Sequence, residues 1–152
     1  MPFSSKDFAK TEGVIRTEMP EDLVHRGVWN SALDKSFSAE RHHAVAIVNV
    51  PSRAVSMTLG GLEPGQSTRR HRHTYETVIL VLEGTGYSEI EGRRVAWTAG
   101  DAFYVPVWAW HNHINSGDTP ARYVAAENTP LLQRLGAAVR EEAPDAPGEA
   151  GH

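Results

Sequence analysis

The chain has 152 residues, of which 40% are hydrophobic and 22% are charged, a composition that fits one globular domain with one core. It contains no cysteine, so disulfides and cysteine-ligated zinc sites are excluded, and any metal must be held by nitrogen and oxygen atoms. The net charge is −4 and no basic stripe is present, which disfavours nucleic acid as a partner.

Residues 1–40 are polar and mixed, without a long periodic pattern, and we expect them to form an arm with short strands or turns. The first ten residues contain no apolar stretch of the kind that a secretory signal needs. No apolar run in the chain is long enough to cross a bilayer. We therefore expect a cytoplasmic protein that has no membrane partner.

Short strand-like segments, separated by turns rich in glycine and proline, fill the region from residue 41 to residue 128. Each either alternates between apolar and polar residues or forms a short β-branched apolar run. The expected strands are 41–50, 54–59, 77–82, 87–90, 93–97, 102–106, 111–115 and 121–126. Many short strands at this spacing predict a β-sandwich or a β-barrel.

The clearest helix signal comes late, over residues 129–142. Thr129 can act as the N-cap and Pro130 suits the first helical position. An apolar stripe at helical spacing follows, formed by Leu131, Leu132, Leu135 and Val139. The remaining residues, 143–152, are rich in proline, glycine and alanine and predict a disordered tail.

Two His-x-His pairs stand out, His71 with His73 and His111 with His113. Residues i and i+2 of a strand point to the same face, so two imidazoles of one pair can bind one metal ion. A third ligand from a neighbouring strand would complete a facial site and leave coordination positions open. Imidazole is a suitable ligand for zinc, iron, nickel and copper alike, so the pattern predicts a metal site without identifying the metal.

Two segments, within residues 43–128, resemble the two sequence motifs of the cupin family. The first motif runs Gly65-x5-His71-x-His73 and closes with Glu83-Gly84. The second runs Gly100-x5-Pro106 and continues to His111 and Asn115. The resemblance implies an all-β fold, a small double-stranded β-helix or jelly-roll barrel over residues 41–128, with the N-terminal arm and the C-terminal helix outside it.

The resemblance also implies that His71, His73 and His111 are the ligands of one divalent metal ion. The family usually adds a glutamate seven residues before the closing glycine of the first motif, and this chain has Thr77 there. Glu76 lies one position earlier. Glu76 is therefore either a fourth ligand or a residue of the surrounding pocket.

Within the cupins, the segments around the two histidine pairs are most similar to gentisate dioxygenases and related ring-cleaving enzymes. Those enzymes use three histidines on iron(II), lack the motif glutamate, and usually contain two cupin domains. The similarity implies an iron(II) dioxygenase that acts on a hydroxylated aromatic or organic acid. Arginines could then bind a substrate carboxylate and tryptophans could form an aromatic wall. The candidates are Arg69, Arg70, Arg122, Trp108 and Trp110.

Two other hypotheses remain open. A zinc or nickel cupin could catalyse a non-redox rearrangement, isomerisation or lyase step in natural-product biosynthesis, and a vaguer similarity links the chain to the zinc cupins of hydrazine synthetases, which form N–N bonds. In that chemistry Glu76, His113 or Tyr104 could act as general acid or base. The chain could also be a cupin that binds a ligand without catalysis. Because exposed edge strands need cover, we expect a homodimer, as is common among cupins.

Overall fold

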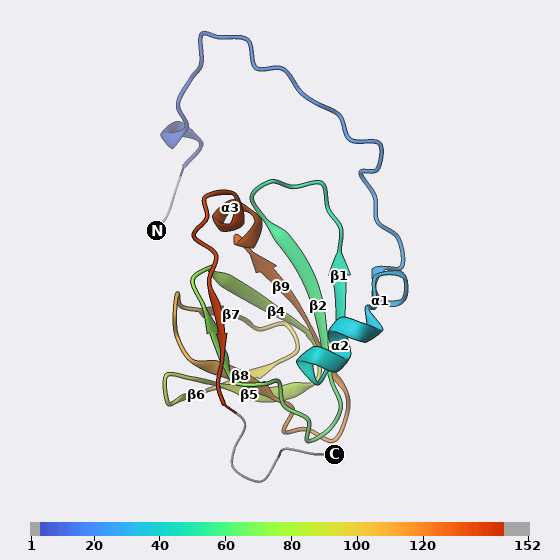
Figure 1. The fold of residues 1–152 in the computed structure, drawn as a ribbon. Helices are drawn as coiled ribbons and strands as arrows, with labels where there is room; N and C mark the ends of the chain where they lie inside the picture. Colours follow the sequence, from blue (N-terminus) through green and yellow to red (C-terminus); the bar gives the residue numbers. More distant parts are fainter. Residues whose placement is uncertain (1–3, 145–152) are drawn as a thin grey trace.

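The computed structural model describes residues 4–144 and shows a barrel of ten strands together with short helical segments (Figure 1). The helical segments are η1 (Ser5–Asp7), α1 (Val28–Ser31), α2 (Lys35–Arg41) and α3 (Thr129–Arg134). The strands are β1 (Ala44–Val48), β2 (Ser56–Leu62), β3 (His71–His73), β4 (Thr77–Glu83), β5 (Thr85–Ile90), β6 (Arg93–Thr98), β7 (Ala102–Val105), β8 (His111–Ile114), β9 (Ala121–Glu127) and β10 (Arg140–Glu142). Within the described residues, no helix is long and apolar enough to cross a membrane.

Two five-stranded antiparallel sheets face each other and enclose the interior. One sheet has the order β1-β2-β9-β4-β7 and the other has the order β10-β3-β8-β5-β6. Alternate side chains of each strand point inward, and one end of the interior is filled by an apolar core. The core residues are Leu62, Ile79, Val81, Ile90, Trp97, Val105, Ala109, Ala121, Tyr123 and Ala125. The predicted all-β barrel is thus confirmed.

Glycines stand where the backbone must take a positive φ angle. The motif glycines Gly65, Gly84 and Gly100 have φ angles of 78°, 84° and 94°, a region that other residues enter only with strain. At Gly84 a Cβ atom would also lie 2.8 Å from the Cα atom of Ala121. The glycine spacing of the two motifs therefore marks turns between strands. These turns set the register of the strands that carry the histidines.

The N-terminal segment differs in part from the expectation. Its described residues, from 4 onward, form three short helical segments instead of strands, and α2 extends through Arg41, so β1 begins at Ala44 and not at residue 41. Asp34 caps α2 by accepting a hydrogen bond from the backbone N–H of Phe37 at 2.8 Å, a typical N-cap contact. Before α1, the chain runs away from the barrel as an extended segment (Figure 1).

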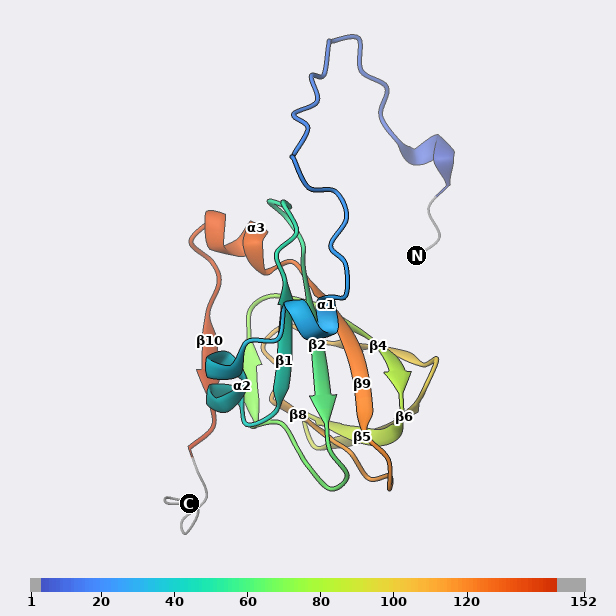
Figure 2. The ribbon, with the colours of Figure 1, turned by 90° about the vertical axis from the view of Figure 1, so that its right-hand side faces the viewer.

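The C-terminal helix is shorter than predicted. It ends at Arg134, and Gly136 follows with a φ of 68°, the conformation that commonly terminates helices. Asn128, not Thr129, occupies the N-cap position, and no side chain caps the helix. Residues 140–142 are not helical but form β10, which pairs antiparallel with β3 (Figure 2). Of the predicted disordered tail, residues 145–152 lie outside the described residues.

Candidate metal centre

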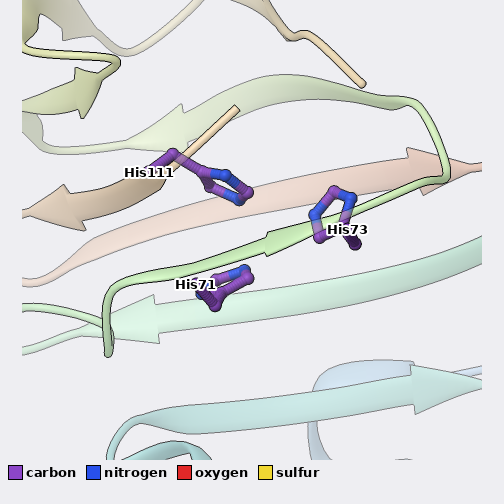
Figure 3. Close-up of side chains that lie close together, drawn as sticks. All are labelled: His71, His73 and His111. Atoms are coloured by element: carbon purple, nitrogen blue, oxygen red, sulfur yellow. The ribbon is translucent and has the colours of Figure 1, made fainter. Parts of the chain in front are cut away.

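Three histidines from two adjacent strands meet in the barrel interior (Figure 3). His71 and His73 lie on β3, and His111 lies on β8 as the cross-strand partner of His71. One potential ligand nitrogen from each histidine lies within 4.8 Å of the other two. The His71 and His111 ring centroids are 4.3 Å apart, and those of His73 and His111 are 4.9 Å apart. The structure thus brings together the three ligands implied by the cupin motifs.

Backbone hydrogen bonds orient all three rings in the same way. The Nδ1 atoms of His71, His73 and His111 lie 2.7, 2.8 and 2.8 Å from the carbonyl oxygens of Arg69, Tyr75 and Ala109. A carbonyl oxygen only accepts hydrogen bonds, so each Nδ1 carries the proton. The lone pair is left on Nε2, which is the arrangement that metal-binding histidines use.

The surroundings keep these histidines neutral. Burial, together with charge repulsion from a neighbouring imidazole, lowers the pKa of His71, His73 and His111 from 6.5 to about 4. Backbone carbonyls oppose the shift without cancelling it. Three neutral imidazoles with converging lone pairs fit a divalent ion of the zinc, iron, nickel or copper type.

The histidines line a cavity of about 500 Å³ between the two sheets, a volume in the range of small-molecule sites. Its walls are largely apolar and aromatic, from residues on several strands. They include Phe37, Val45, Ile47, Tyr75, Ile79, Tyr123, Ala125 and Val139. The Tyr75 ring stacks on His73 with centroids 3.8 Å apart, so it fixes one side of the metal centre.

His113 also lines the cavity, but its hydrogen bonds differ from those of His71, His73 and His111. The Trp97 indole N–H donates to Ser88 Oγ at 3.0 Å, and Ser88 Oγ lies 2.7 Å from His113 Nδ1. With Ser88 donating its hydroxyl hydrogen to Nδ1, the proton of His113 sits on Nε2. Burial lowers the pKa of His113 well below 6.5, so the ring is a neutral donor.

Cationic side chains gather at the edge of the cavity, where α2 and β10 lie side by side (Figure 2). Arg41 and Arg140 both line the cavity. They share Oε1 of Glu142, with Arg41 Nη1 at 3.0 Å and Arg140 Nη2 at 3.1 Å, and Arg140 also donates to the Tyr75 hydroxyl at 3.1 Å. Arg69 Nε lies 3.9 Å from the other oxygen of Glu142. Glu40 Oε1 lies 4.0 Å from Arg41 Nε, so three guanidinium groups meet two carboxylates and this edge keeps a net positive charge.

The structure places Glu76 outside the cavity. Glu76 is exposed and accepts a hydrogen bond from the Tyr104 hydroxyl at 2.9 Å, and its backbone N–H donates to Asn128 Oδ1 at 2.8 Å. Strand alternation explains this placement, because Thr77 points inward and is buried, which turns the preceding residue outward. Neither Glu76 nor Tyr104 is brought to the histidines.

Most of the arginines and tryptophans that the sequence predicts to bind substrate lie on the outer surface. The Arg72 guanidinium stacks on Trp108 and Trp110, with its carbon 4.4 and 4.5 Å from the ring centroids. Arg122 stacks on Trp29 at 4.4 Å and lies 3.8 Å from Glu83. None of these side chains lines the cavity. Arg69 adjoins the cationic edge through Glu142, whereas Arg70 stacks on Trp110 at 4.8 Å.

Sequence reasoning did not identify several residues of the cavity. The sequence predicts a strand at Arg41 and a helix at Arg140, and the last predicted strand ends one residue before Glu127. The signal for Glu127 was available in the sequence. Tyr123, Ala125 and Glu127 are spaced two apart, so they share the inward face of β9, and all three line the cavity.

Comparison with known proteins places these features in a family. Residues 58–127 match the family described as "Cupin domain". The chain is 44% identical over 87 residues to a 5-aminosalicylate 1,2-dioxygenase of Comamonas sp., covering 57% of this chain and 23% of the relative. It is 31% identical over 134 residues to a gentisate 1,2-dioxygenase of Aquipseudomonas alcaligenes, covering 76% of this chain and 39% of the relative. The chain thus spans well under half the length of these relatives.

The chain is also similar to a relative of similar length and to a solved structure. A 5-nitrosalicylic acid 1,2-dioxygenase of Bradyrhizobium sp. is 27% identical over 168 residues, with 93% of this chain and 81% of the relative covered. Salicylate 1,2-dioxygenase from Pseudoaminobacter salicylatoxidans, solved as an adduct with gentisate, superposes with a TM-score of 0.64 at 22% identity. That match covers 74% of this chain and 33% of the other, and it supports the same fold.

Proposed function

This chain is a cupin, and on that premise we propose that it is an iron(II)-dependent dioxygenase that cleaves the ring of a hydroxylated aromatic acid. One observation carries the proposal. Three neutral histidines direct their Nε2 lone pairs to one point of an apolar cavity, and no carboxylate in the described part of the chain joins their group. Such a site leaves coordination positions open for substrate and oxygen. The named activities of the relatives supply the reaction class.

The bound iron would supply the redox chemistry, by which one molecule of O2 is consumed and both its atoms enter the product as a ring C–C bond breaks. The side chains of this protein bind and orient the substrate. The cationic edge formed by Arg41 and Arg140 attracts a carboxylate, which guanidinium groups bind well. The Nε2–H of His113 donates a hydrogen bond to a substrate oxygen, and the apolar walls exclude bulk water.

The proposal is tested by oxygen uptake. Protein reconstituted with iron(II) without oxygen is mixed with salicylate, gentisate and 5-aminosalicylate, and O2 consumption is measured together with loss of the aromatic absorbance. We expect one O2 consumed per ring opened for at least one of these acids. Alanine substitution of His71, His73 or His111 removes the uptake, whereas the exposed His42→Asn control retains it. Full activity in the alanine variants would contradict the proposal.

Zinc defines the second candidate function. The same three neutral imidazoles suit zinc as well as iron, and zinc chemistry would be a non-redox isomerisation or lyase step. Zinc-loaded protein is expected to bind the aromatic acids but to consume no oxygen. Turnover by the zinc-loaded form without oxygen would favour this second candidate.

We further propose a cytoplasmic homodimer. Val78, Leu80 and Leu82 on the outer face of β4 are 50%, 41% and 49% exposed, a row of apolar side chains that a second copy could cover. The extended arm adds further exposed apolar residues, namely Phe8, Val14, Ile15, Met19, Leu23 and Val24. Size-exclusion chromatography with light scattering tests this, and a monomer at micromolar concentration would contradict it.

A further inference from the structure

A polar patch lies on the cavity wall that faces the histidines. The histidines belong to β3 and β8, whereas this patch belongs to the other sheet, where Glu127 on β9 is the cross-strand partner of Thr77 on β4. Hydroxyl groups surround the Glu127 carboxyl on the same wall. The lining residues that bear them are Ser56, Thr58, Thr77 and Thr129.

Hydrogen-bonding capacity within this patch is not used up by the protein. The Thr77 side chain is only 4% exposed, and its hydroxyl lies close enough to the Glu127 carboxyl to help lower the pKa of that group, although it makes no hydrogen bond of full geometry among the described residues. Glu127 accepts a long hydrogen bond of 3.4 Å from the Thr129 hydroxyl. A carboxylate can accept about four hydrogen bonds, so both groups keep capacity for a ligand.

The environment of Glu127 is consistent with a dry, ligand-binding wall. Burial raises the pKa of its carboxyl, while nearby hydroxyl groups and the charge of Arg41 partly oppose that shift. An unpaired buried polar group costs free energy in the absence of a ligand. Such groups are few in native proteins, and a bound ligand, a water or an ion is the partner that usually satisfies them.

We propose that Glu127 and Thr77 form a second polar subsite, which binds an amino or hydroxyl substituent on the ring edge remote from the three histidines. The inference rests on the proposed function, because it takes the substrate to be an aromatic acid. When the carboxylate and hydroxyl of a salicylate face the histidine side, its 5-position points to the opposite wall. A carboxylate there accepts hydrogen bonds from N–H or O–H groups but repels the oxygens of a nitro group.

Glu127 acts in this proposal as a specificity-determining residue and not as a metal ligand. Its carboxyl is not in the group of ligand atoms that lie within 4.8 Å of one another. It occupies the facing sheet, as the cross-strand partner of Thr77. Metal content should therefore be unchanged when Glu127 is replaced.

The test is a binding panel on zinc-loaded protein, which measures affinity without turnover. Dissociation constants of salicylate, 5-aminosalicylate and 5-nitrosalicylate are determined by calorimetry for the wild type, Glu127→Gln and Thr77→Val. We expect Glu127→Gln to weaken the binding of 5-aminosalicylate by about tenfold or more, which is the usual effect of losing a hydrogen bond to a charged group. Salicylate should bind unchanged and 5-nitrosalicylate should bind no more weakly. Thr77→Val should weaken the binding of 5-aminosalicylate alone, by a few-fold.

Glu76→Gln is the matched control, since Glu76 is an exposed glutamate outside the cavity and should shift none of the three constants. Thermal melting and zinc content of each variant report on folding and on the metal site. An equal change for all three ligands, no change for any, or loss of zinc in Glu127→Gln would overturn the inference. If no salicylate binds to the wild type, the proposed function itself fails and the inference fails with it.

Discussion

The hydrogen-bonded chain from Trp97 through Ser88 to His113 allows a quantitative prediction. Ser88→Ala removes a hydroxyl that is fully buried and that contacts both other residues. The Trp97 indole N–H and the His113 Nδ1 then lose their partner, and each unsatisfied buried group costs about 1–3 kcal/mol. We therefore expect a loss of about 2–6 kcal/mol in the free energy of unfolding.

Urea denaturation of the metal-free protein measures this loss, with Ser36→Ala on the exposed face of α2 as the control. Nitrogen NMR of the imidazole adds a readout of the tautomer. The wild type should carry its His113 proton on Nε2, and Ser88→Ala should populate both tautomers. A change in unfolding free energy within about 0.5 kcal/mol, as at an ordinary surface site, would refute this account of the buried network.

Three further predictions concern the site and the barrel. His111→Ala should weaken metal binding at least about 100-fold, measured by competition with a chelator; unchanged affinity would count against the three-histidine centre. In the metal-free protein His71, His73 and His111 are neutral with pKa values of about 4, while the unfolded chain takes up protons below 6.5. Stability should therefore fall as pH drops from 6.5 to 4, by up to about 1.4 kcal/mol per pH unit per histidine, and a flat profile would contradict this. Gly86→Ala places a Cβ 2.2 Å from the Ile114 carbonyl oxygen and should destabilise the barrel by about 2–3 kcal/mol in urea denaturation, whereas a silent substitution would contradict the packing.

The barrel and the three histidines could be predicted because they depend on local rules. Glycines with positive φ end the strands, and the i, i+2 spacing puts His71 and His73 on one face. The C-terminal strand could not be predicted in the same way. Residues 137–142 favour helix by composition, but pairing of β10 with β3 outweighs that preference.

The polar groups that line the cavity could not be predicted from the sequence for a related reason. Glu76 was chosen by its distance from the motif glycine, yet strand alternation turns Thr77 inward and Glu76 outward. The carboxyl group that does line the cavity comes from Glu127, which is 50 residues from Thr77 in the sequence and adjacent only through the pairing of β4 with β9. Cross-strand neighbours of this kind depend on topology, which the residue pattern alone did not specify.

The most direct test of the central claim is the metal content of protein purified without added metal, measured together with oxygen consumption on salicylates. The proposal predicts one iron per chain, bound through the three histidines, and one O2 consumed per ring opened. Stoichiometric zinc in the purified protein, with no oxygen uptake by either the purified or the iron(II)-reconstituted form, would contradict it.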